Sequence, residues 1–148
     1  VRTFEAAAFL RRCGADITLV KKMFRDDMEC YQLKAAIISN AKVFREKFAI
    51  AENLRSNVES PTIVGAQAAN ELLDINEIKA SFVLTVYGNR IYVSARSIDE
   101  VNVQVIMEKL GGGGHMNAAG AQFDHTDIDR AVKAVEDVID KMLEKGDL

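Results

Sequence analysis

The sequence predicts a mixed α/β domain that follows a helical segment. Three observations lead to this fold class. Residues 1–47 show apolar side chains at helical spacing, residues 81–97 read as two strands around a tight turn, and residues 126–146 form a long amphipathic helix. We therefore expect a helical segment over residues 1–47 and, over residues 48–148, a mixed sheet flanked by helices.

Turn and cap residues divide the helical segment. Gly14 stands where a left-handed residue would end a first helix. Asp16 or Thr18 is suited to cap a second helix through its side-chain oxygen. A third helix is expected from Met28 to Glu46, because apolar residues recur there at helical spacing. These apolar positions are Leu33, Ala36, Ile37 and Phe44.

The pattern changes after residue 47. Residues 48–54 alternate loosely and predict a strand. Ser60 followed by Pro61 predicts a helix start, with the serine hydroxyl as the cap and proline at the first helical position. The apolar face of this helix would be Ile63, Val64, Ala68, Ala69, Leu72 and Leu73.

The clearest element is the hairpin of residues 81–97. Gly88-Asn89 is a two-residue loop with glycine first, as a type II′ turn requires. The resulting register places Val86 opposite Ile91, so the hairpin has one wholly apolar face and one polar face. The polar face carries Thr85, Tyr87, Arg90, Tyr92, Ser94 and Arg96.

The remaining residues predict a short helix, a strand and a long helix. Residues 102–110 form the short helix, which ends in glycine, and residues 121–124 form the last strand. Thr126 is positioned to cap the long helix, and Gly146 ends it. The apolar stripe of this helix is Ile128, Ala131, Val132, Val135, Val138, Ile139, Met142 and Leu143.

Charge is unevenly spread along the chain, whose formal net charge is −3. Residues 1–47 carry ten Lys/Arg against six Asp/Glu, a net charge of +4. Residues 48–148 carry nine against sixteen, a net charge of −7. Because proteins that bind long nucleic acids neutralise many phosphates, the acidic part argues against such a ligand. An anionic ligand is expected to be small and held by a few groups.

Other features bear on the origin of the chain. No apolar run approaches the ~18 residues of a membrane span. The sequence begins at Val1 rather than at methionine, so we expect an excised part of a longer protein. Cys13 and Cys30 lack metal-ligand spacing and are predicted to be free, buried and in a reducing compartment.

Residues 111–120, with the sequence GGGGHMNAAG, carry the candidate chemistry. Four glycines allow positive φ and close approach of backbone to a ligand. Successive N–H groups in such a turn form an anion-binding concavity, and His115 adds a ring donor. We expect a phosphate or carboxylate here. The alternative is a flexible linker or an extended helix cap, which explains His115 and the following Ala-Ala-Gly poorly.

This motif, downstream of Ser-Ala-Arg-Ser at residues 94–97 and before an amphipathic helix, resembles the DHHA1 domain. That domain accompanies the DHH phosphoesterase domain in RecJ-like exonucleases, oligoribonucleases and cyclic dinucleotide phosphodiesterases. The resemblance covers residues 48–145, and residues 2–16 resemble the end of a DHH domain and its linker. Together these segments are most similar to cyclic-di-AMP phosphodiesterases of the GdpP/YybT type.

The resemblance implies that the chain is the substrate-binding part of a phosphodiesterase that converts cyclic-di-AMP to linear pApA. The glycine amides and His115 would hold a substrate phosphate, Arg96 would be a second anion contact, and Asn117 would help to orient the nucleotide. The implied substrate-binding residues are Arg96, Gly112, Gly113, Gly114, His115 and Asn117.

The chain also departs from the DHH family, which binds manganese through aspartates and histidines of its first domain, including an Asp-His-His run. This chain has two histidines and no such run. Residues 124–126 are interpreted as a turn, and residues 26–27 as a solvated helix end. We therefore expect no catalytic residue, metal ligand or cofactor in this segment, and manganese in a missing DHH domain. The chain alone is expected to be inactive.

The resemblance implies a small nucleotide substrate, cyclic-di-AMP or a short oligonucleotide, and an upstream DHH domain as partner. A homodimer is one arrangement that it admits. It also implies a cytoplasmic location without direct membrane contact, in a parent anchored in the cell membrane. The alternatives are part of an oligoribonuclease or RecJ-like exonuclease, or a non-catalytic nucleic-acid-binding module, and the net charge of residues 48–148 argues against long-strand ligands.

Overall fold

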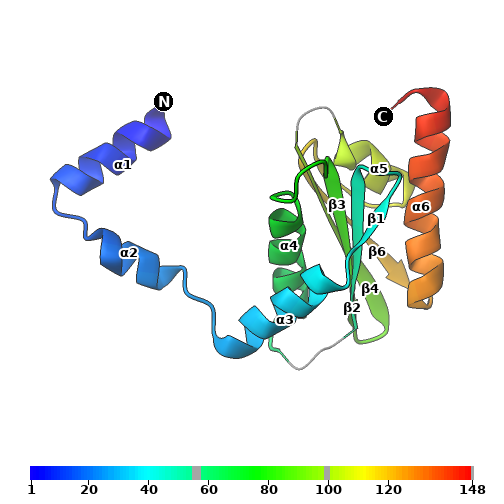
Figure 1. Ribbon diagram of the computed structural model, residues 1–148, viewed down its shortest axis with the longest axis horizontal. Helices are drawn as coiled ribbons and strands as arrows, with labels where there is room; N and C mark the ends of the chain where they lie inside the picture. The colour runs from blue at the N-terminus through cyan, green and yellow to red at the C-terminus, as the bar shows by residue number, and fades with distance from the viewer. Residues whose placement is uncertain (55–57, 99–100, 148) are drawn as a thin grey trace.

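A computed structural model describes residues 1–54, 58–98 and 101–147, and in this part of the chain a six-stranded sheet lies between two helical layers (Figure 1). The predicted mixed α/β fold is confirmed. The strands are β1 (Lys42–Phe44), β2 (Phe48–Asn53), β3 (Ala80–Tyr87), β4 (Arg90–Ser97), β5 (Gly113–His115) and β6 (Ala118–Asp124). The helices are α1 (Arg2–Arg12), α2 (Ile17–Met23), α3 (Met28–Ser39), α4 (Pro61–Leu72), α5 (Val103–Lys109) and α6 (Ile128–Lys145).

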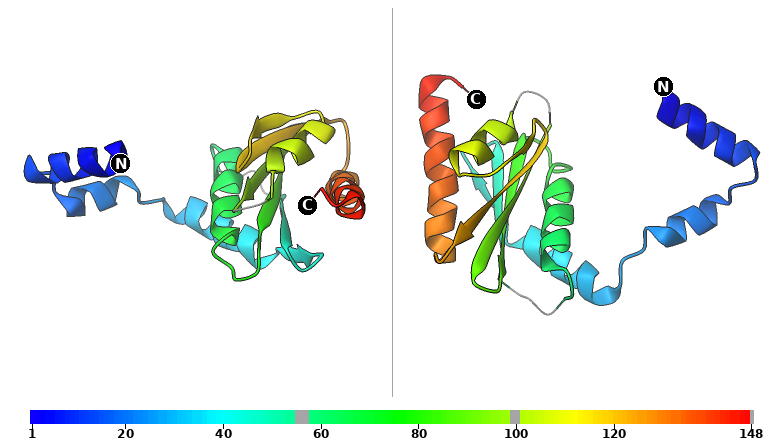
Figure 2. Two further views of the ribbon diagram at one scale, coloured as in Figure 1. Left: turned by 90° about the horizontal axis from the view of Figure 1, so that it is seen from above. Right: turned by 180° about the vertical axis from the view of Figure 1, so that it is seen from behind.

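The sheet has the order β1-β2-β3-β4-β6-β5. Strands β2 and β3 are parallel and are joined through α4, whereas every other neighbouring pair is antiparallel. Helices α3 and α4 cover one face, and α5 and α6 cover the other (Figure 2). Each face therefore has its own apolar core: Phe82, Leu84, Ile106, Val135 and Ile139 on the α6 side, and Ile37, Ala68, Leu72 and Val83 on the α4 side.

The predicted hairpin register is confirmed. Val86 pairs with Ile91, and Gly88 has φ +63° as the first residue of the turn. Arg96 pairs with Ser81, whose hydroxyl donates a hydrogen bond to the carbonyl of Ala69 in α4. The polar face of β4 therefore lies on the α4 side of the sheet.

The third helix is shorter than predicted, ending at Ser39 rather than Glu46. Asn40 follows it and exchanges two hydrogen bonds with the backbone of Glu52 in β2. Residues 42–44 then pair with β2 as strand β1. The helical spacing of the apolar residues is overridden because sheet pairing satisfies the backbone of this segment. Arg45, in the turn after β1, pairs with Asp140 of α6 through both carboxylate oxygens.

The predicted start of α4 is confirmed, with Ser60 as the N-cap residue and Pro61 as the first helical residue, but the predicted capping hydrogen bond of Ser60 and the predicted cap residue of α6 are wrong. Ser60 precedes α4, but its side chain makes no capping hydrogen bond. Asp127, not Thr126, caps α6, and its carboxylate accepts from the N–H of Arg130 at 2.8 Å. The last strand begins at Ala118 instead of residue 121, because its first residues pair with both β4 and β5.

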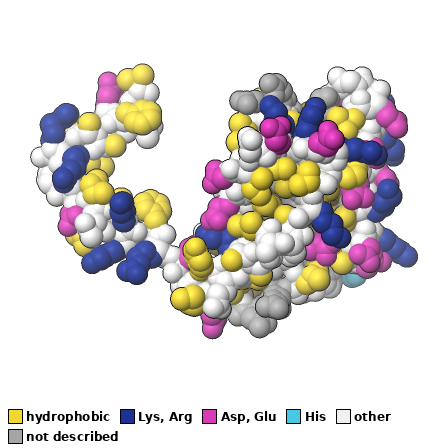
Figure 3. Space-filling view, in the orientation of Figure 1, with side chains coloured by type: hydrophobic (Ala, Val, Ile, Leu, Met, Phe, Trp, Pro, Cys, Tyr) yellow, Lys and Arg dark blue, Asp and Glu magenta, His cyan; other side chains and the backbone are white. Residues whose placement is uncertain are grey.

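Helices α1 and α2 form an arm that lies away from the sheet (Figures 1 and 2). Neither helix has a buried residue, and Phe4, Met23 and Phe24 are each 82% exposed. Figure 3 shows apolar and basic side chains together along this arm. Both cysteines are free as predicted, but neither is buried: Cys13, just after α1, is exposed, and Cys30, in the first turn of α3, lies half-buried at the edge of the α4-side core.

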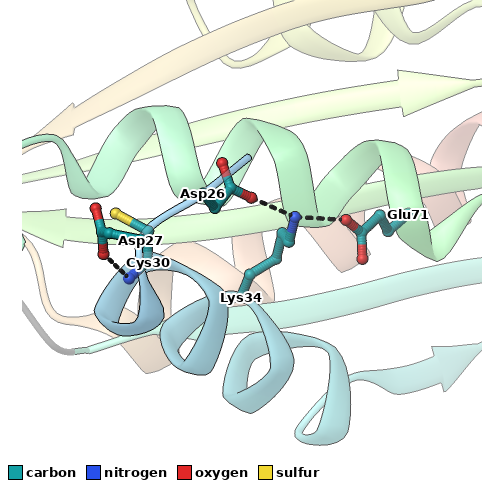
Figure 4. A network of polar contacts seen from close by, with 5 residues as sticks. All are labelled: Asp26, Asp27, Cys30, Lys34 and Glu71. Atoms are coloured by element: carbon teal, nitrogen blue, oxygen red, sulfur yellow. Dashed lines mark hydrogen bonds and ion pairs between the residues drawn. The ribbon is translucent and has the colours of Figure 1, made fainter. Parts of the chain in front are cut away.

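A three-residue ion cluster fixes the point where the arm joins the domain (Figure 4). Lys34 of α3 is only 8% exposed, and its Nζ lies 2.9 Å from Asp26 Oδ2 and 2.7 Å from Glu71 Oε1 of α4. Hydrogen bonds to Glu71 and Asp26 raise the pKa of Lys34. Asp27 caps α3 by accepting from the Cys30 N–H, which lowers the pKa of Asp27. These contacts tie the end of the arm to α4.

Replacing the central cation tests this attachment. Lys34→Met retains an apolar stem but leaves two carboxylates without their shared cation, so we expect the free energy of unfolding to fall by about 1–3 kcal/mol. Urea denaturation at neutral pH measures this change. The matched control is Lys133→Met, which breaks an exposed ion pair with Asp137 and should leave the free energy of unfolding close to that of wild type.

The pH dependence of the same pair of proteins gives a second measurement. Since the pKa of Lys34 is raised in the folded state, its stabilisation is complete at neutral pH and is lost as pH rises through that raised value. The stability difference between wild type and Lys34→Met should therefore shrink above about pH 10.5. A difference that is absent at neutral pH would contradict the assigned role.

Candidate functional site

The glycine run forms half of a hairpin. The N–H groups of Gly111 and Gly112 donate to the carbonyls of Glu108 and Met107 at 3.0 and 2.8 Å and so close the end of α5. Residues 113–115 form strand β5, which pairs with β6. The run is therefore not a flexible linker. Its first two glycines extend the cap of α5, as the other alternative held, and its last two lie in an edge strand, so its amides do not form the single converging turn that the sequence predicted.

Two of the glycines are required by close backbone packing. A Cβ on Gly112 would overlap the carbonyl oxygen of Gly120, and a Cβ on Gly114 would lie 2.5 Å from the Cα of Ala119. Gly114 also has φ +147°. Gly113 differs, since a Cβ there would meet no atom within 4 Å and its φ lies outside the left-handed region. The side of β5 above Gly113 is therefore open.

Strands β4, β6 and β5 present an open surface on the α4 side of the sheet, because α4 packs mainly on β3 and β4. Their register creates rows of side chains across the three strands. One row is Arg96, Ala118 and His115, the next is Ser94, Gly120 and Gly113, and the third is Tyr92 and Gln122. We call the surface formed by these eight residues the shelf.

Arg96 and His115 lie in one row with only a methyl group between them. Arg96 is half-buried, and its Nη1 donates to the carbonyl of Ala95 at 2.8 Å. Burial lowers the pKa of Arg96, and no carboxylate in the described part of the chain pairs with it. His115 is exposed. A partly desolvated guanidinium without a counter-charge is suited to bind an anion.

Asn117 lies in the turn between β5 and β6. The side-chain Nδ2 of Asn117 donates to the backbone carbonyl of Ser97 at 3.3 Å. The backbone carbonyl of Asn117 accepts from the Ser97 N–H at 3.1 Å. These bonds hold the tip of the β5–β6 hairpin against the end of β4. A role for Asn117 in orienting a nucleotide stays a prediction.

A groove of about 590 Å³ continues the shelf away from Arg96. Thr62 in the first turn of α4 forms part of one wall, and Gly111 and Gly112 contribute to its lining. Sequence reasoning missed Thr62 and Gln122 as site residues. Tyr92 and Ser94 are on the same predicted polar face as Arg96. This shared face is the signal that could have identified Tyr92 and Ser94 as site residues. The other lining residues are Tyr92, Val93, Ser94, Gly120, Ala121, Gln122 and Asp124.

The described residues do not provide a metal site. No group of three or more His, Cys, Asp or Glu side chains in this part of the chain is arranged to hold a metal ion. The manganese that the resemblance implies for a separate DHH domain stays a prediction. No described helix is both long enough and apolar enough to cross a membrane.

Comparison with known proteins identifies the family. The DHHA1 domain matches residues 47–141, which is more than half of the chain. The chain belongs to the DHHA1 domain family. This match includes the shelf, the glycine run and most of α6, and it agrees with the resemblance stated from the sequence.

Curated relatives and a solved structure extend this result. The chain is 38% identical over 94% of its length to the cyclic-di-AMP phosphodiesterase PdeA of Listeria monocytogenes, of which it covers 21%. It is 38% identical over 98% of its length to the cyclic-di-AMP phosphodiesterase GdpP of Bacillus subtilis, of which it covers 22%. An exopolyphosphatase-related protein from Bacteroides fragilis has the same fold, with a TM-score of 0.84, 21% identity, and coverage of 95% of this chain and 43% of that one.

The chain is much shorter than the two phosphodiesterases that it matches. It spans about a fifth of the phosphodiesterases that it matches. The two relatives described above are phosphodiesterases by name. The activity of the whole enzyme is not carried by this comparison to the segment itself.

Gly112 and Gly113 should differ in how much stability the protein loses when each is replaced by alanine. Gly112→Ala places a methyl group against backbone, so we expect a loss of about 1–3 kcal/mol in the free energy of unfolding. Gly113→Ala adds a methyl group in open space and should leave stability within about 1 kcal/mol of wild type. Urea denaturation of both variants tests the hairpin, and equal losses would contradict its geometry.

Proposed function

We propose that this chain is the substrate-binding part of a metal-dependent phosphodiesterase that hydrolyses cyclic-di-AMP to linear pApA. The names of the similar PdeA and GdpP proteins support this substrate. The structural observation that carries the proposal is Arg96, a half-buried cation with no paired carboxylate in the described part of the chain. It shares a row with His115, so two donors converge on one small anion.

The row geometry suits a phosphate. Arg96 and His115 stand on the first and third strands of the row, so their backbones are about 10 Å apart. The methyl group of Ala118 between them leaves room for a phosphate that both side chains reach. Binding at two points orients the phosphate, and orientation of this kind lowers the barrier to a reaction carried out by other groups.

Charge favours a short ligand over a long strand. Residues 48–148 carry a net charge of −7, and Asp124 lies at the groove end of the shelf. A dinucleotide presents few phosphates and can place them near the Arg96 row alone. A long strand would extend over acidic surface, with an electrostatic cost.

The exposed arm supports the presence of an adjoining domain. Its large apolar side chains have no partner within the described residues, and the relatives are more than four times as long as this chain. The arm would pack on the preceding DHH domain of the parent, which would hold the manganese. The domain described here would lie on the cytoplasmic side of a membrane-anchored parent.

Removal of either donor should slow the intact parent enzyme. Each of Arg96→Ala and His115→Ala deletes a contact to phosphate, so kcat/KM should fall about 10–100-fold. Arg96→Lys should recover part of the loss, because it restores the charge without the planar fork. The control Arg130→Ala removes an exposed cation from α6 and should leave kcat/KM unchanged. Wild-type activity in both alanine variants would refute the phosphate contact.

If this chain binds the substrate and the DHH domain holds the metal, the isolated 148-residue chain should be inactive. When it is incubated with manganese and cyclic-di-AMP, chromatography should detect no pApA, because the described residues offer no metal site. Addition of the remaining part of the parent should restore turnover. Turnover by the chain alone, at the rate of the intact enzyme, would show that a catalytic site lies within it.

A further inference from the structure

The shelf continues past the phosphate row and ends in an aromatic ring and an amide. Tyr92 of β4 and Gln122 of β6 pair directly across the two strands. Tyr92 precedes Arg96 by four residues, which is about 13 Å along the strand. One nucleotide can span this distance with its phosphate at Arg96. The two ends of the shelf therefore differ in chemistry and are separated by a suitable length.

The row between these ends has almost no side chains. Ser94, Gly120 and Gly113 follow one another across the three strands, and the space above Gly113 is open. Thr62 of α4 rises beside this floor as one wall of the groove. A flat ring can lie on such a bare backbone surface, whereas larger side chains here would fill the space.

The amide of Gln122 is held in place by its neighbours. Its Nε2 donates to Asp124 Oδ1 at 3.4 Å, and Asp124 pairs with Arg90 at 2.8 Å. Tyr92 and Asp124 both raise the pKa of Arg90, so Arg90 is a neighbour of each. Asp124 thus uses one N–H of the amide and leaves Oε1 and the second N–H for a ligand. The same charged pair positions both the aromatic ring and the amide.

Resting on the proposed function, we propose that Tyr92 and Gln122 form the base-recognition subsite of the shelf. The nucleobase would lie on the bare floor against Tyr92, with its edge facing Gln122. A carboxamide presents one acceptor beside one donor, which matches the exocyclic amine and the adjacent ring nitrogen of adenine. The corresponding major-groove edge of guanine presents two acceptors and does not match. Gln122 is therefore a specificity-determining residue for adenine.

Titration of the 148-residue chain with cyclic-di-AMP, cyclic-di-GMP and inorganic phosphate, followed by amide NMR shifts, tests this subsite. The wild type should bind cyclic-di-AMP about tenfold more tightly than cyclic-di-GMP. In Gln122→Glu the carboxylate only accepts, so the adenine ligand should weaken about tenfold and the preference should narrow or reverse. The control Gln32→Glu adds the same charge at an exposed position of α3 and should retain the wild-type ratio of affinities for the two dinucleotides.

Three further variants separate contact with the base from contact with phosphate. Tyr92→Ala should weaken both dinucleotides about tenfold, and Tyr92→Phe, which keeps the ring, should bind them nearly as well as wild type. In Gly113→Leu the added Cβ meets no atom within 4 Å and the rest of the side chain would extend over the floor, so this variant should block dinucleotides while inorganic phosphate still binds. Its thermal stability should remain that of wild type.

The outcomes distinguish the two proposals. If the wild type binds neither dinucleotide, the proposed function fails and this subsite fails with it. If the wild type binds cyclic-di-AMP in an Arg96-dependent way while Gln122→Glu keeps the adenine preference, the subsite is refuted and the proposed function stands. Equal affinity of the wild type for phosphate and for both dinucleotides would also refute base recognition.

Discussion

The strand register of β3, β4 and β6 is the constraint on which the rest of this structure depends. The two-residue turn at Gly88 makes Val86 face Ile91, and the alternation along β4 then sends Val93 into the α6 core and Arg96 to the opposite side. Because side chains alternate with period two, a slip of one residue would exchange these faces. It would bury Arg96 among apolar side chains and dismantle every row of the shelf at once.

The close packing of α4 on β3 and β4 determines how much of this face of the sheet remains open. Gly65 lies so near β3 that a Cβ there would overlap the hydroxyl of Thr85. That hydroxyl is buried without a hydrogen-bond partner among the described residues, an energetic cost that the apolar packing of α4 offsets. Since α4 packs on β3 and β4, the β6–β5 side carries only small and polar residues on this face, and ligand chemistry becomes available there.

Local patterns explain what the sequence could predict. The hairpin, α4, α6 and the helical arm were found because their signals lie within a few neighbouring residues. Strands β1 and β5 were missed, since each has three residues and owes its form to pairing with a distant segment. For the site, Arg96 and His115 came from recognisable motifs, whereas Gln122 meets Tyr92 only through the pairing of β4 with β6. No local pattern carries that juxtaposition.

The buried lysine that joins α3 to α4 has a mechanical consequence. Lys34 links Asp26, at the root of the arm, directly to Glu71 near the end of α4. The connection between the arm and the domain is thus held by two ion pairs of one buried side chain. The ion cluster therefore lies at one end of α4, and Thr62 of the groove wall lies at the other end of the same helix.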